Sequence, residues 1–494
     1  MRILSVNIEG YKIFNPSPKI TLGKDIQLLI GVNGSGKSTV LEAVAIIFSQ
    51  VKEYCENPKT RERKFNFSIE YSFNLSEIEE ETTNTQKTNL SINHIFLSSS
   101  KETGLEFSMY VNKKEVTTPQ EMYKYLPDNL IFYYAGACNT LEEIIDKTED
   151  EQAKDLYGKT NENNISKVIE SITKNIIYIR KDYYPLLFAL NFIDRDLSLP
   201  LNGKKFTIKN IRFDIKQFRY TKNTDYKNLF KLTGFLRTYA DNLLKHSFGV
   251  EFDEDNSIAF FNVDYHRGLL EAIEELPNLT EDQRFNQTRF LAFHFISLLF
   301  RIGFIKKINI SISDEDGNVY LIDDFSEGEQ QLIILDSIKK VLCQNNTVLF
   351  LDEPDSYLHP QRQRELIPYL KDIFTESFTQ VIATTHSPFV AQSVDIENIL
   401  VFSKKGKPST HKEDILSYIS INNELFGIHS EYSIEIETKL KEFQKMVAKI
   451  ISKDNELNDS FYSLRDELNT FGEAVRFITS FETRKLISNG IEVL

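Results

Sequence analysis

The sequence predicts an α/β fold, and three observations support this prediction. Apolar runs that suit buried strands end in glycine-rich or charged residues at 26–31, 348–353 and 381–386. Apolar residues recur at helical spacing directly after the first of these runs, from Thr39 to Ser49. Alternating apolar and polar residues, separated by polar turns, fill much of 65–135. We therefore expect a doubly wound parallel sheet accompanied by an antiparallel β subdomain.

The first apolar run leads into Gly31-Val32-Asn33-Gly34-Ser35-Gly36-Lys37-Ser38-Thr39, which fits the pattern G-x-x-x-x-G-K-[ST]. Glycines in such a loop let backbone N–H groups surround nucleotide phosphates, and the following helix adds its dipole. Lys37 can then reach the β- and γ-phosphates, while the Ser38 hydroxyl can bind Mg²⁺. The residues expected to contact the nucleotide are Asn33, Gly34, Ser35, Gly36, Lys37, Ser38 and Thr39.

Length and composition limit the class of protein. A chain of 494 residues is too long for one core and suggests two to four structural units. Apolar residues make up 41% and no apolar run is long enough to cross a membrane, so we expect a cytoplasmic protein. Cys55, Cys138 and Cys343 lack the spacing of a zinc site or a disulfide framework. The formal net charge of −14 argues against a wholly basic nucleic-acid coat protein.

The remaining elements follow from the same patterns. Residues 1–10 and 20–22 are predicted to be strands. Further strands are predicted at Phe65–Phe73, His94–Ser98, Leu105–Val111 and Leu130–Tyr134. Residues 140–200, 255–305 and about 410–494 are predicted to be largely helical. Ile308–Ser313 is expected to pair with Val319–Ile322 across Asp316-Gly317.

A helix is predicted to begin after residue 325. Ser326 is placed as its N-cap, and Glu329 follows three residues later in the pattern of a capping box. Apolar periodicity extends this helix to about Leu342. Taken alone, the motif indicates only a capped helix.

Two strands that follow this helix end in residues suited to phosphate chemistry. The run that begins at Val348 ends in Asp352 and Glu353, which can bring Mg²⁺ and a water molecule to phosphates. The run that begins at Val381 ends near His386. Because ligands collect at the carboxyl ends of parallel strands, these residues and the phosphate loop are expected to meet at one nucleotide.

The ordered set of phosphate loop, S-x-G-E-Q-Q, Asp-Glu-Pro-Asp, Tyr-Leu-His-Pro and Thr-His-Ser-Pro resembles the ABC-type ATPases of the SMC, RecF and OLD group. The resemblance covers about residues 1–75 and 300–405. It implies an ABC-type ATPase head, a P-loop NTPase sheet with an antiparallel β subdomain, split by a mixed α+β insert. The expected parts are 1–140 and 301–405 for the head, 141–300 for the insert and 406–494 for a helical C-terminal tail.

The resemblance also implies roles for individual residues. Asp352 would hold Mg²⁺ together with Ser38, Glu353 would polarise the attacking water, and His386 would contact the γ-phosphate. Catalysis is therefore expected from Glu353, His386 and Lys37, with ATP and Mg²⁺ bound.

In this group the helix after the S-x-G-E-Q-Q motif completes the site of a second subunit. Ser326, Gly328 and Glu329 would thus face the partner's ATP, and Asp355 would lie in the loop that joins the two sites. We therefore expect a homodimer or a higher even-numbered homo-oligomer. Tyr11 and Lys12 lie where related ATPases contact the base or phosphates, with ordinary surface as the alternative. The glutamine that the group carries between its two halves is not identified, and Asn139 is the candidate.

The segment Lys204–Lys245 carries eleven Lys or Arg against three Asp, with aromatic residues between them. This composition suits DNA or RNA, because basic side chains follow phosphates and aromatic rings stack on bases. The alternative is a strand with an apolar inner face and a basic outer face, which the alternation from Ile211 to Lys216 also fits. Both interpretations remain open.

Other candidate sites favour structural roles. Arg289 and His294 have the spacing of some ribonuclease pairs, but the apolar residues between them favour a packed helix. His359 belongs to the loop after the acidic strand. The apolar stripes of the helical tail are expected to pack on their own domain. The alternative is a helical unit with little core of its own, which could dock on a neighbour or partner.

The resemblance suggests a stand-alone ATPase of bacterial restriction or anti-phage systems, similar to the PtuA subunit of Septu. We hypothesise a nucleotide-gated sensor that controls a separately encoded nuclease or toxin. One alternative is a RecF-like ATPase of DNA repair. Another is an oligomeric scaffold that ATP locks together with negligible turnover.

Overall fold

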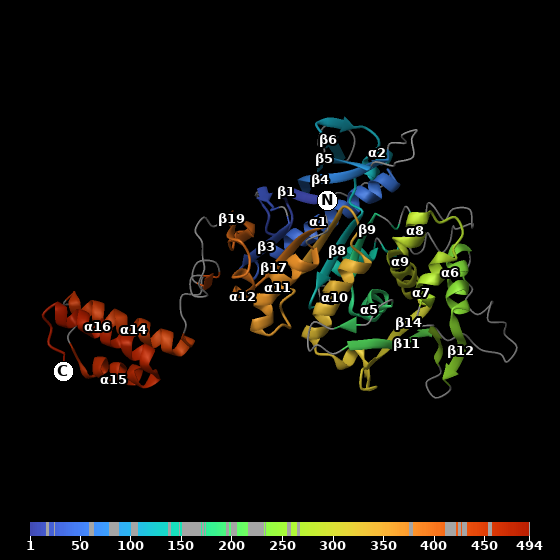
Figure 1. Ribbon diagram of the computed structural model, residues 1–494. Helices are drawn as coiled ribbons and strands as arrows, with labels where there is room; N and C mark the ends of the chain where they lie inside the picture. Colours follow the sequence, from blue (N-terminus) through green and yellow to red (C-terminus); the bar gives the residue numbers. More distant parts are fainter. Residues whose placement is uncertain are drawn as a thin grey trace. The chain divides into compact units, whose positions relative to one another are not determined.

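The computed structural model forms two compact units, Met1–Tyr418 and Ile419–Leu494 (Figure 1). The residues that the structure describes are 1–494 without 16–18, 24, 59–63, 79–87, 100–106, 137–139, 148, 151–168, 170–171, 173, 194–196, 199–204, 216–231, 233, 254–257, 264–266, 375–378, 411–420, 423–425, 427–431, 453–456 and 494.

A seven-stranded sheet of order β19-β18-β3-β17-β16-β8-β9 forms the centre of the first unit. Its strands are β3 (Ile26–Gly31), β8 (Asn129–Tyr134), β9 (Asn175–Ile179), β16 (Thr347–Asp352), β17 (Gln380–Thr385), β18 (Ile399–Phe402) and β19 (Pro408–Thr410). Neighbouring strands are parallel except for β18 and β19. Every residue of β3, β16 and β17 is buried, as expected for strands whose two faces are both covered.

A six-stranded antiparallel sheet of order β2-β1-β4-β5-β6-β7 lies beside it. Its strands are β1 (Arg2–Glu9), β2 (Lys19–Thr21), β4 (Asn66–Ile78), β5 (Thr88–Ser99), β6 (Phe107–Val111) and β7 (Lys114–Val116), and α2 (Pro119–Lys124) follows. Helix α1 (Lys37–Glu56) lies between the two sheets, because its buried residues share one hydrophobic core with residues of both. The ring of Phe48 in α1, for example, is 5.7 Å from the ring of Tyr71 in β4.

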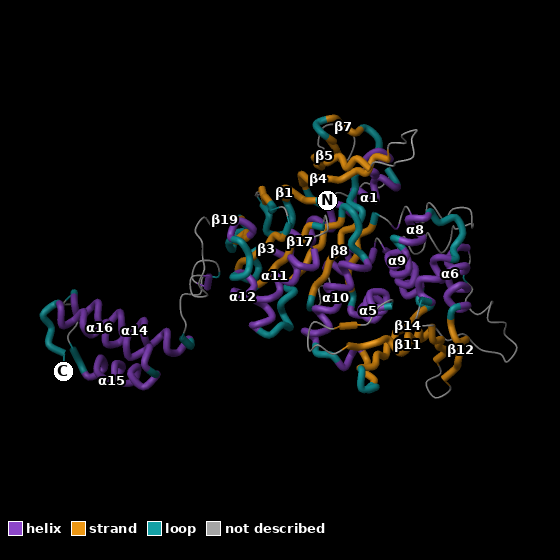
Figure 2. Tube along the Cα trace, in the orientation of Figure 1, coloured by secondary structure: helices purple, strands orange, loops and turns teal. Residues whose placement is uncertain are grey.

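A third sheet, of order β12-β13-β11-β14-β15 with β10 paired to β11, occupies another part of this unit (Figure 2). Its strands are β10 (Leu197–Ser198), β11 (Lys205–Ile215), β12 (Ser247–Asp253), β13 (Ile258–Val263), β14 (Ile305–Asp314) and β15 (Val319–Leu321). The helices around it are η2 (Lys181–Tyr183), α5 (Tyr184–Phe192), α6 (Gly234–Lys245), α7 (Gly268–Glu274), α8 (Glu281–Phe285) and α9 (Thr288–Arg301). The expected pairing of 308–313 with 319–322 is confirmed, since β14 and β15 are antiparallel neighbours.

Further helical segments are described in the first unit. They are η4 (Ile322–Asp324), α10 (Glu327–Val341), α11 (Pro360–Phe374), α12 (Pro388–Ala391) and η5 (Ile396–Asn398). Figure 1 shows α10 and α11 on the face of the central sheet that points away from the antiparallel sheet. The Tyr369 hydroxyl of α11 donates a 3.2 Å hydrogen bond to the Leu332 carbonyl of α10.

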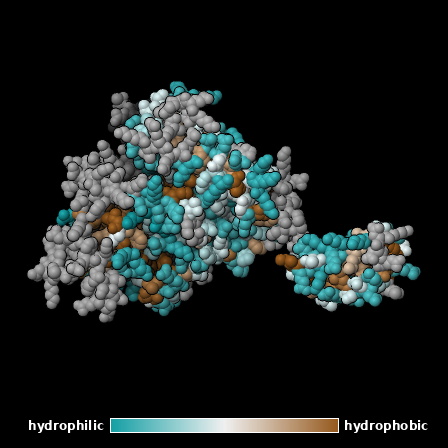
Figure 3. All heavy atoms as spheres, turned by 180° about the vertical axis from the view of Figure 1, so that it is seen from behind, coloured by the Kyte–Doolittle hydropathy of each residue, from teal (hydrophilic) through white to brown (hydrophobic). Residues whose placement is uncertain are grey.

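The second unit contains α14 (Ile434–Ile451), α15 (Asp459–Leu468), η6 (Asn469–Phe471) and α16 (Glu473–Ser488). These helices enclose a core of eight buried apolar residues, so the alternative of a unit with little core is wrong. Phe477 and Phe481 of α16 remain 74% and 55% exposed. The space-filling view in Figure 3 shows such apolar atoms among a mainly hydrophilic surface of this unit.

The predicted α/β fold class is confirmed, with a parallel sheet and an antiparallel sheet enclosing one helix. Residues 140–200 were expected to be largely helical, but Asn175–Ile179 forms β9 at the edge of the central sheet. Its four apolar residues, 176–179, suit a buried strand and a helical turn equally, so pairing with β8 decides between them.

Candidate functional site

The phosphate loop joins β3 to α1 at the carboxyl edge of the central sheet. Gly36 is the N-cap of α1, has a φ of 99°, and makes no side-chain cap. A Cβ at Gly36 would lie 2.6 Å from Ile13 Cδ1, so both conformation and space require glycine there. The first turn of α1 also carries no acidic residue. Its backbone N–H groups therefore form a positive helix end suited to an anion.

Lys37 folds back onto the phosphate loop. Its Nζ donates hydrogen bonds of 3.0 Å to the Gly31 carbonyl and 3.4 Å to the Val32 carbonyl. Burial lowers the pKa of Lys37, whereas the nearby Asp352 and Glu353 carboxylates act to raise it. The ammonium group thus lies between the phosphate loop and the acids at the end of β16.

Ser38 and Asp352 meet across the site. The Ser38 hydroxyl donates a 3.1 Å hydrogen bond to Asp352 Oδ1, which also accepts one from the Thr384 hydroxyl. Burial raises the pKa of Asp352, and its two hydroxyl partners act to lower it. Two oxygen ligands of one octahedral Mg²⁺, each at about 2.0–2.1 Å, lie about 2.9 Å apart when adjacent. The oxygen pair of Ser38 and Asp352 therefore fits Mg²⁺.

Glu353 has a left-handed backbone, with a φ of 51°. Its carboxylate Oε1 lies 3.6 Å from His386 Nε2, and its Oε2 accepts a 3.3 Å hydrogen bond from the Ser356 hydroxyl. Burial is the main cause that lowers the pKa of His386; Lys37 adds to this, and Glu353 opposes it. His386 is thus a largely neutral imidazole at neutral pH.

Strand register explains how these residues meet. Asp352 of β16 pairs with Thr384 of β17, which in turn pairs with Leu29 of β3. The three strand ends therefore lie side by side, and the structure brings together Lys37, Ser38, Asp352, Glu353 and His386.

The predicted N-cap of α10 is confirmed. Ser326 and Glu329 form a reciprocal capping box, in which Glu329 Oε2 accepts from the Ser326 backbone N–H at 3.0 Å and from its hydroxyl at 2.8 Å. A Cβ at Gly328 would lie 2.9 Å from the Tyr357 carbonyl oxygen. None of the hydrogen bonds or ion pairs among the described residues joins this cap to the phosphate loop or to His386.

Three polar side chains that the motif analysis overlooked support the site. Gln331 of α10 donates a hydrogen bond to the Pro354 carbonyl, directly after the acid pair. Gln363 of α11 donates to the Asp355 carbonyl at 3.1 Å and accepts from the Ser387 hydroxyl at 2.7 Å. Thr384 contacts Asp352 as described above. For Thr384, the sequence signal that was available is a polar residue near the end of a largely apolar strand.

The N-terminal candidates Tyr11 and Lys12 are both bound to α1. The Tyr11 hydroxyl and Lys12 Nζ donate to Glu42 Oε2 at 3.3 Å and 2.5 Å. Asn139 lies outside the described residues.

The structure also describes the candidates Arg289, His294 and His359. Arg289 Nε donates to the Leu190 carbonyl at 2.9 Å. His294 is 4% exposed, and burial lowers its pKa to about 3. The packed-helix interpretation is therefore confirmed. His359 Nδ1 accepts a 3.3 Å hydrogen bond from the Gln361 N–H.

Within Lys204–Lys245 the structure describes β11 and α6 but neither Lys204 nor 216–231. Apolar side chains of β11 are buried, while Lys205 and Lys209 are exposed. Arg212 pairs with Asp214 at 2.7 Å and lies over the Phe260 ring at 3.7 Å. This part of the segment matches the strand interpretation and still leaves a basic outer face at Lys205 and Lys209.

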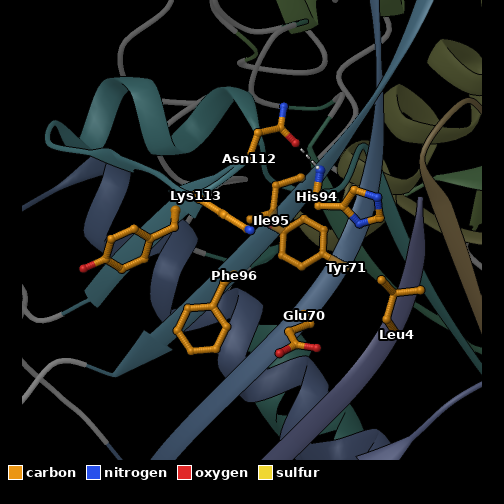
Figure 4. Close-up of a pocket in the computed structure, with 9 residues that line it drawn as sticks. Leu4, Glu70, Tyr71, His94, Ile95, Phe96, Asn112 and Lys113 are labelled. Atoms are coloured by element: carbon orange, nitrogen blue, oxygen red, sulfur yellow. Dashed lines mark hydrogen bonds between the residues drawn. The ribbon is translucent and has the colours of Figure 1, made fainter.

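A separate cavity of about 630 Å³ lies on the outer face of the antiparallel sheet (Figure 4). Its lining includes the Glu70 carboxylate, the Phe96 ring and His94. None of its described lining residues belongs to the motifs above.

The parallel sheet, the phosphate loop and the paired acids define a P-loop nucleoside triphosphatase. The chain belongs to the family described as AAA ATPase domain, whose model matches residues 1–391.

Two curated relatives carry the printed names of retron ATPases. The chain is 21% identical to "Retron Vc95 probable ATPase" of Vibrio cholerae serotype O1 biovar El Tor, over 82% of this chain and 74% of that protein. It is 28% identical to "Retron Ec83 probable ATPase" of Escherichia coli, over 29% of this chain and 27% of that protein. The family match confirms the prediction of an AAA family ATPase.

Among solved structures, the SMC head domain from Thermotoga maritima matches 84% of this chain and 100% of that chain at 12% identity and a TM-score of 0.35. An SMC head bound to the C-terminal winged-helix domain of ScpA matches 83% of this chain and 98% of that chain at 13% identity, with the same TM-score of 0.35. Within the described residues, no helix is long and apolar enough to cross a membrane.

Proposed function

We propose that this protein binds and hydrolyses ATP at a site shared between two copies of the chain. The observation that supports this proposal is the meeting of Lys37, Ser38, Asp352, Glu353 and His386 at one edge of the central sheet. Lys37 and the N–H groups of the loop hold the phosphates, and Glu353 accepts a proton from the attacking water. Bound Mg²⁺, held by Ser38 and Asp352, supplies positive charge beside the phosphate oxygens.

The second copy enters through the capped end of α10. Ser326, Gly328 and Glu329 make no described contact with the phosphate loop of their own chain. The N-terminal end of α10 is exposed and is the positive end of the helix dipole. Placed against the γ-phosphate of a partner, it stabilises charge that the partner's own residues do not reach. ATP then favours the paired state, and hydrolysis releases it.

The biological role that we propose is nucleotide-gated control of an effector in a bacterial anti-phage or restriction system. The printed names of the two retron ATPases support this direction. The nuclease or toxin is proposed to be a separate polypeptide, as the resemblance to the PtuA subunit of Septu implies.

The shared site is tested by mixing two inactive variants. Lys37→Ala removes nucleotide binding, and Ser326→Arg blocks the N-terminal end of α10. Each variant alone should therefore lose ATP hydrolysis by at least about 100-fold. A mixed pair contains one intact site, made of the loop from one chain and the serine from the other. We expect mixing to restore turnover.

A matched control is Ser433→Arg, because Ser433 caps α14 in the second unit. This variant should hydrolyse ATP normally. Failure of the mixture to recover turnover, with each variant folded, would contradict the shared site. The Glu353→Gln variant separates ATP binding from hydrolysis: sedimentation should show that it dimerises with ATP although it no longer hydrolyses ATP. Normal hydrolysis by this variant would contradict the role of Glu353.

Nucleic-acid binding at the exposed face of β11 is a further part of the proposal. Reversing Lys205 and Lys209 to Glu should abolish salt-sensitive DNA or RNA binding. The control reverses Lys445 and Lys449, which are exposed on α14. Equal binding by both double variants would exclude this surface.

A further inference from the structure

One threonine hydroxyl connects the two catalytic acids. Thr384 is 0% exposed and lies opposite Asp352 in the strand register. Its hydroxyl donates to Asp352 Oδ1 and accepts a 3.1 Å hydrogen bond from the Glu353 backbone N–H. The same N–H also reaches the Thr384 carbonyl, at 3.2 Å. Both acceptors of the Glu353 amide therefore belong to Thr384.

The residue that receives these bonds, Glu353, has an unfavourable backbone conformation. Glu353 has a φ of 51°, in the left-handed region that is unfavourable for a residue with a side chain. Such a conformation persists where its surroundings determine it, and at Glu353 they do so through the amide. The left-handed turn directs the carboxylate toward His386, with Oε1 at 3.6 Å from Nε2, instead of continuing β16.

We propose that Thr384 is a positioning residue for ATP hydrolysis, which holds the backbone of Glu353 and the carboxylate of Asp352 in one arrangement. This inference rests on the proposed function. Neighbouring threonines have other partners: the Thr385 hydroxyl accepts from the Ser387 N–H at 2.8 Å, and the Thr347 hydroxyl accepts from the Gln344 N–H at 3.0 Å.

The test replaces Thr384 with Val, which has nearly the same shape but no hydroxyl. A misplacement of about 1 Å at a reacting group lowers rates by roughly 100-fold, so we expect kcat to fall by about 10- to 100-fold. ATP affinity should change by less than about threefold, because Thr384 does not line the phosphate loop. Thr384→Ser should keep kcat near that of the parent.

Three controls separate positioning from packing. Thr347→Val removes an equally buried hydroxyl at the opposite end of the adjacent strand and should leave kcat unchanged. Thr384→Ala and Thr384→Ser both lack the threonine methyl group and differ by one hydroxyl oxygen, so their ratio of kcat values measures the effect of the hydroxyl if the Val variant misfolds. Adding Thr384→Val to Glu353→Gln should cause a smaller loss than Thr384→Val causes alone, since only the bond to Asp352 still matters when the Glu353 side chain is inert.

The outcomes distinguish the two proposals. A parent protein without ATP hydrolysis would refute the proposed function. Normal turnover in the parent, loss in Glu353→Gln and equal kcat for Thr384→Ala and Thr384→Ser would refute the positioning role alone. Additive losses in the Glu353→Gln background would also refute it.

Discussion

At the scale of single residues, three acids close together in sequence lie in different environments. Asp352 is buried between two hydroxyl groups, whereas Glu353 is half-buried beside His386. Burial raises the pKa of Asp355 to about 6, with opposing hydrogen bonds and with Glu353 adding to the rise. Within the described residues, Asp355 Oδ1 has no hydrogen-bond partner. Asp355 is therefore the acid whose charge the folded chain accommodates least.

We predict that Asp355→Asn makes stability less dependent on pH. The folded pKa of about 6 exceeds the ordinary value of 3.8, so the folded state binds more protons between these values. The contribution of this carboxyl to the free energy of unfolding is fully present below pH 3.8, the ordinary pKa. It is lost as the pH rises through about 6, the folded pKa. Without nucleotide, the variant should exceed the parent in stability by up to ~3 kcal/mol at pH 7.5 and match it near pH 4.

Urea denaturation at the two pH values measures this difference. Asp395→Asn is the control, because Asp395 is an exposed carboxylate paired with Lys371. A stability difference for Asp355→Asn that stays constant with pH would contradict the prediction.

The sequence alone predicts those residues of the site that belong to a short continuous motif. Lys37 and Ser38 follow from the loop, and Asp352 and Glu353 from the end of an apolar strand. Thr384 was not predictable in the same way, because its bonds depend on β16 and β17 being neighbours in register. Gln331 likewise gains its role only when α10 packs beside Pro354.

At the scale of elements, the cap of α10 combines two tasks. Ser326 satisfies an N–H group of its own helix, and we propose that the same helix end contacts a partner's ATP. The reciprocal bonds of Glu329 hold the serine in place.

We predict that these two tasks can be separated. Ser326→Ala should destabilise the first unit by about 1 kcal/mol, because Glu329 N–H loses its acceptor. Glu329→Gln keeps both reciprocal bonds and should change stability by only a few tenths of a kcal/mol. Thermal unfolding without nucleotide measures both, and equal destabilisation by the two variants would contradict this account.

Element boundaries were predictable where periodicity was long. Helix α10 was expected from its N-cap at Ser326 to about Leu342, and it ends at Val341. The short strand β9 was misread because five residues carry little periodicity, and only the free edge of β8 assigns them to the sheet.

At the scale of the whole molecule, the chain divides into a large and a small unit with separate cores. The C-terminal helices bury Phe443 and Phe461, whose rings stack at 5.0 Å, without any residue of the first unit in that core. Each unit therefore has its own source of stability.

We predict that a chain truncated after residue 418 folds and binds ATP with unchanged affinity. Calorimetry of the full chain should show two transitions, of which truncation removes the smaller. A truncated protein that no longer binds ATP would contradict the independence of the first unit. The parallel variant Phe477→Ser with Phe481→Ser should leave both transitions in place, because these side chains lie outside the core.

The order of strands has a consequence for synthesis. In the sheet, β3 lies between β17 and β18. In the chain, most of the first unit separates β3 from these two later strands. At about 5–20 residues per second, the ribosome needs roughly 20–70 s to reach β17 after completing β3. Throughout this interval β3, which is apolar apart from Gln27, lacks both of its neighbouring strands. Nascent chains arrested before residue 380 should consequently recruit holdase chaperones, and they should aggregate when released without them.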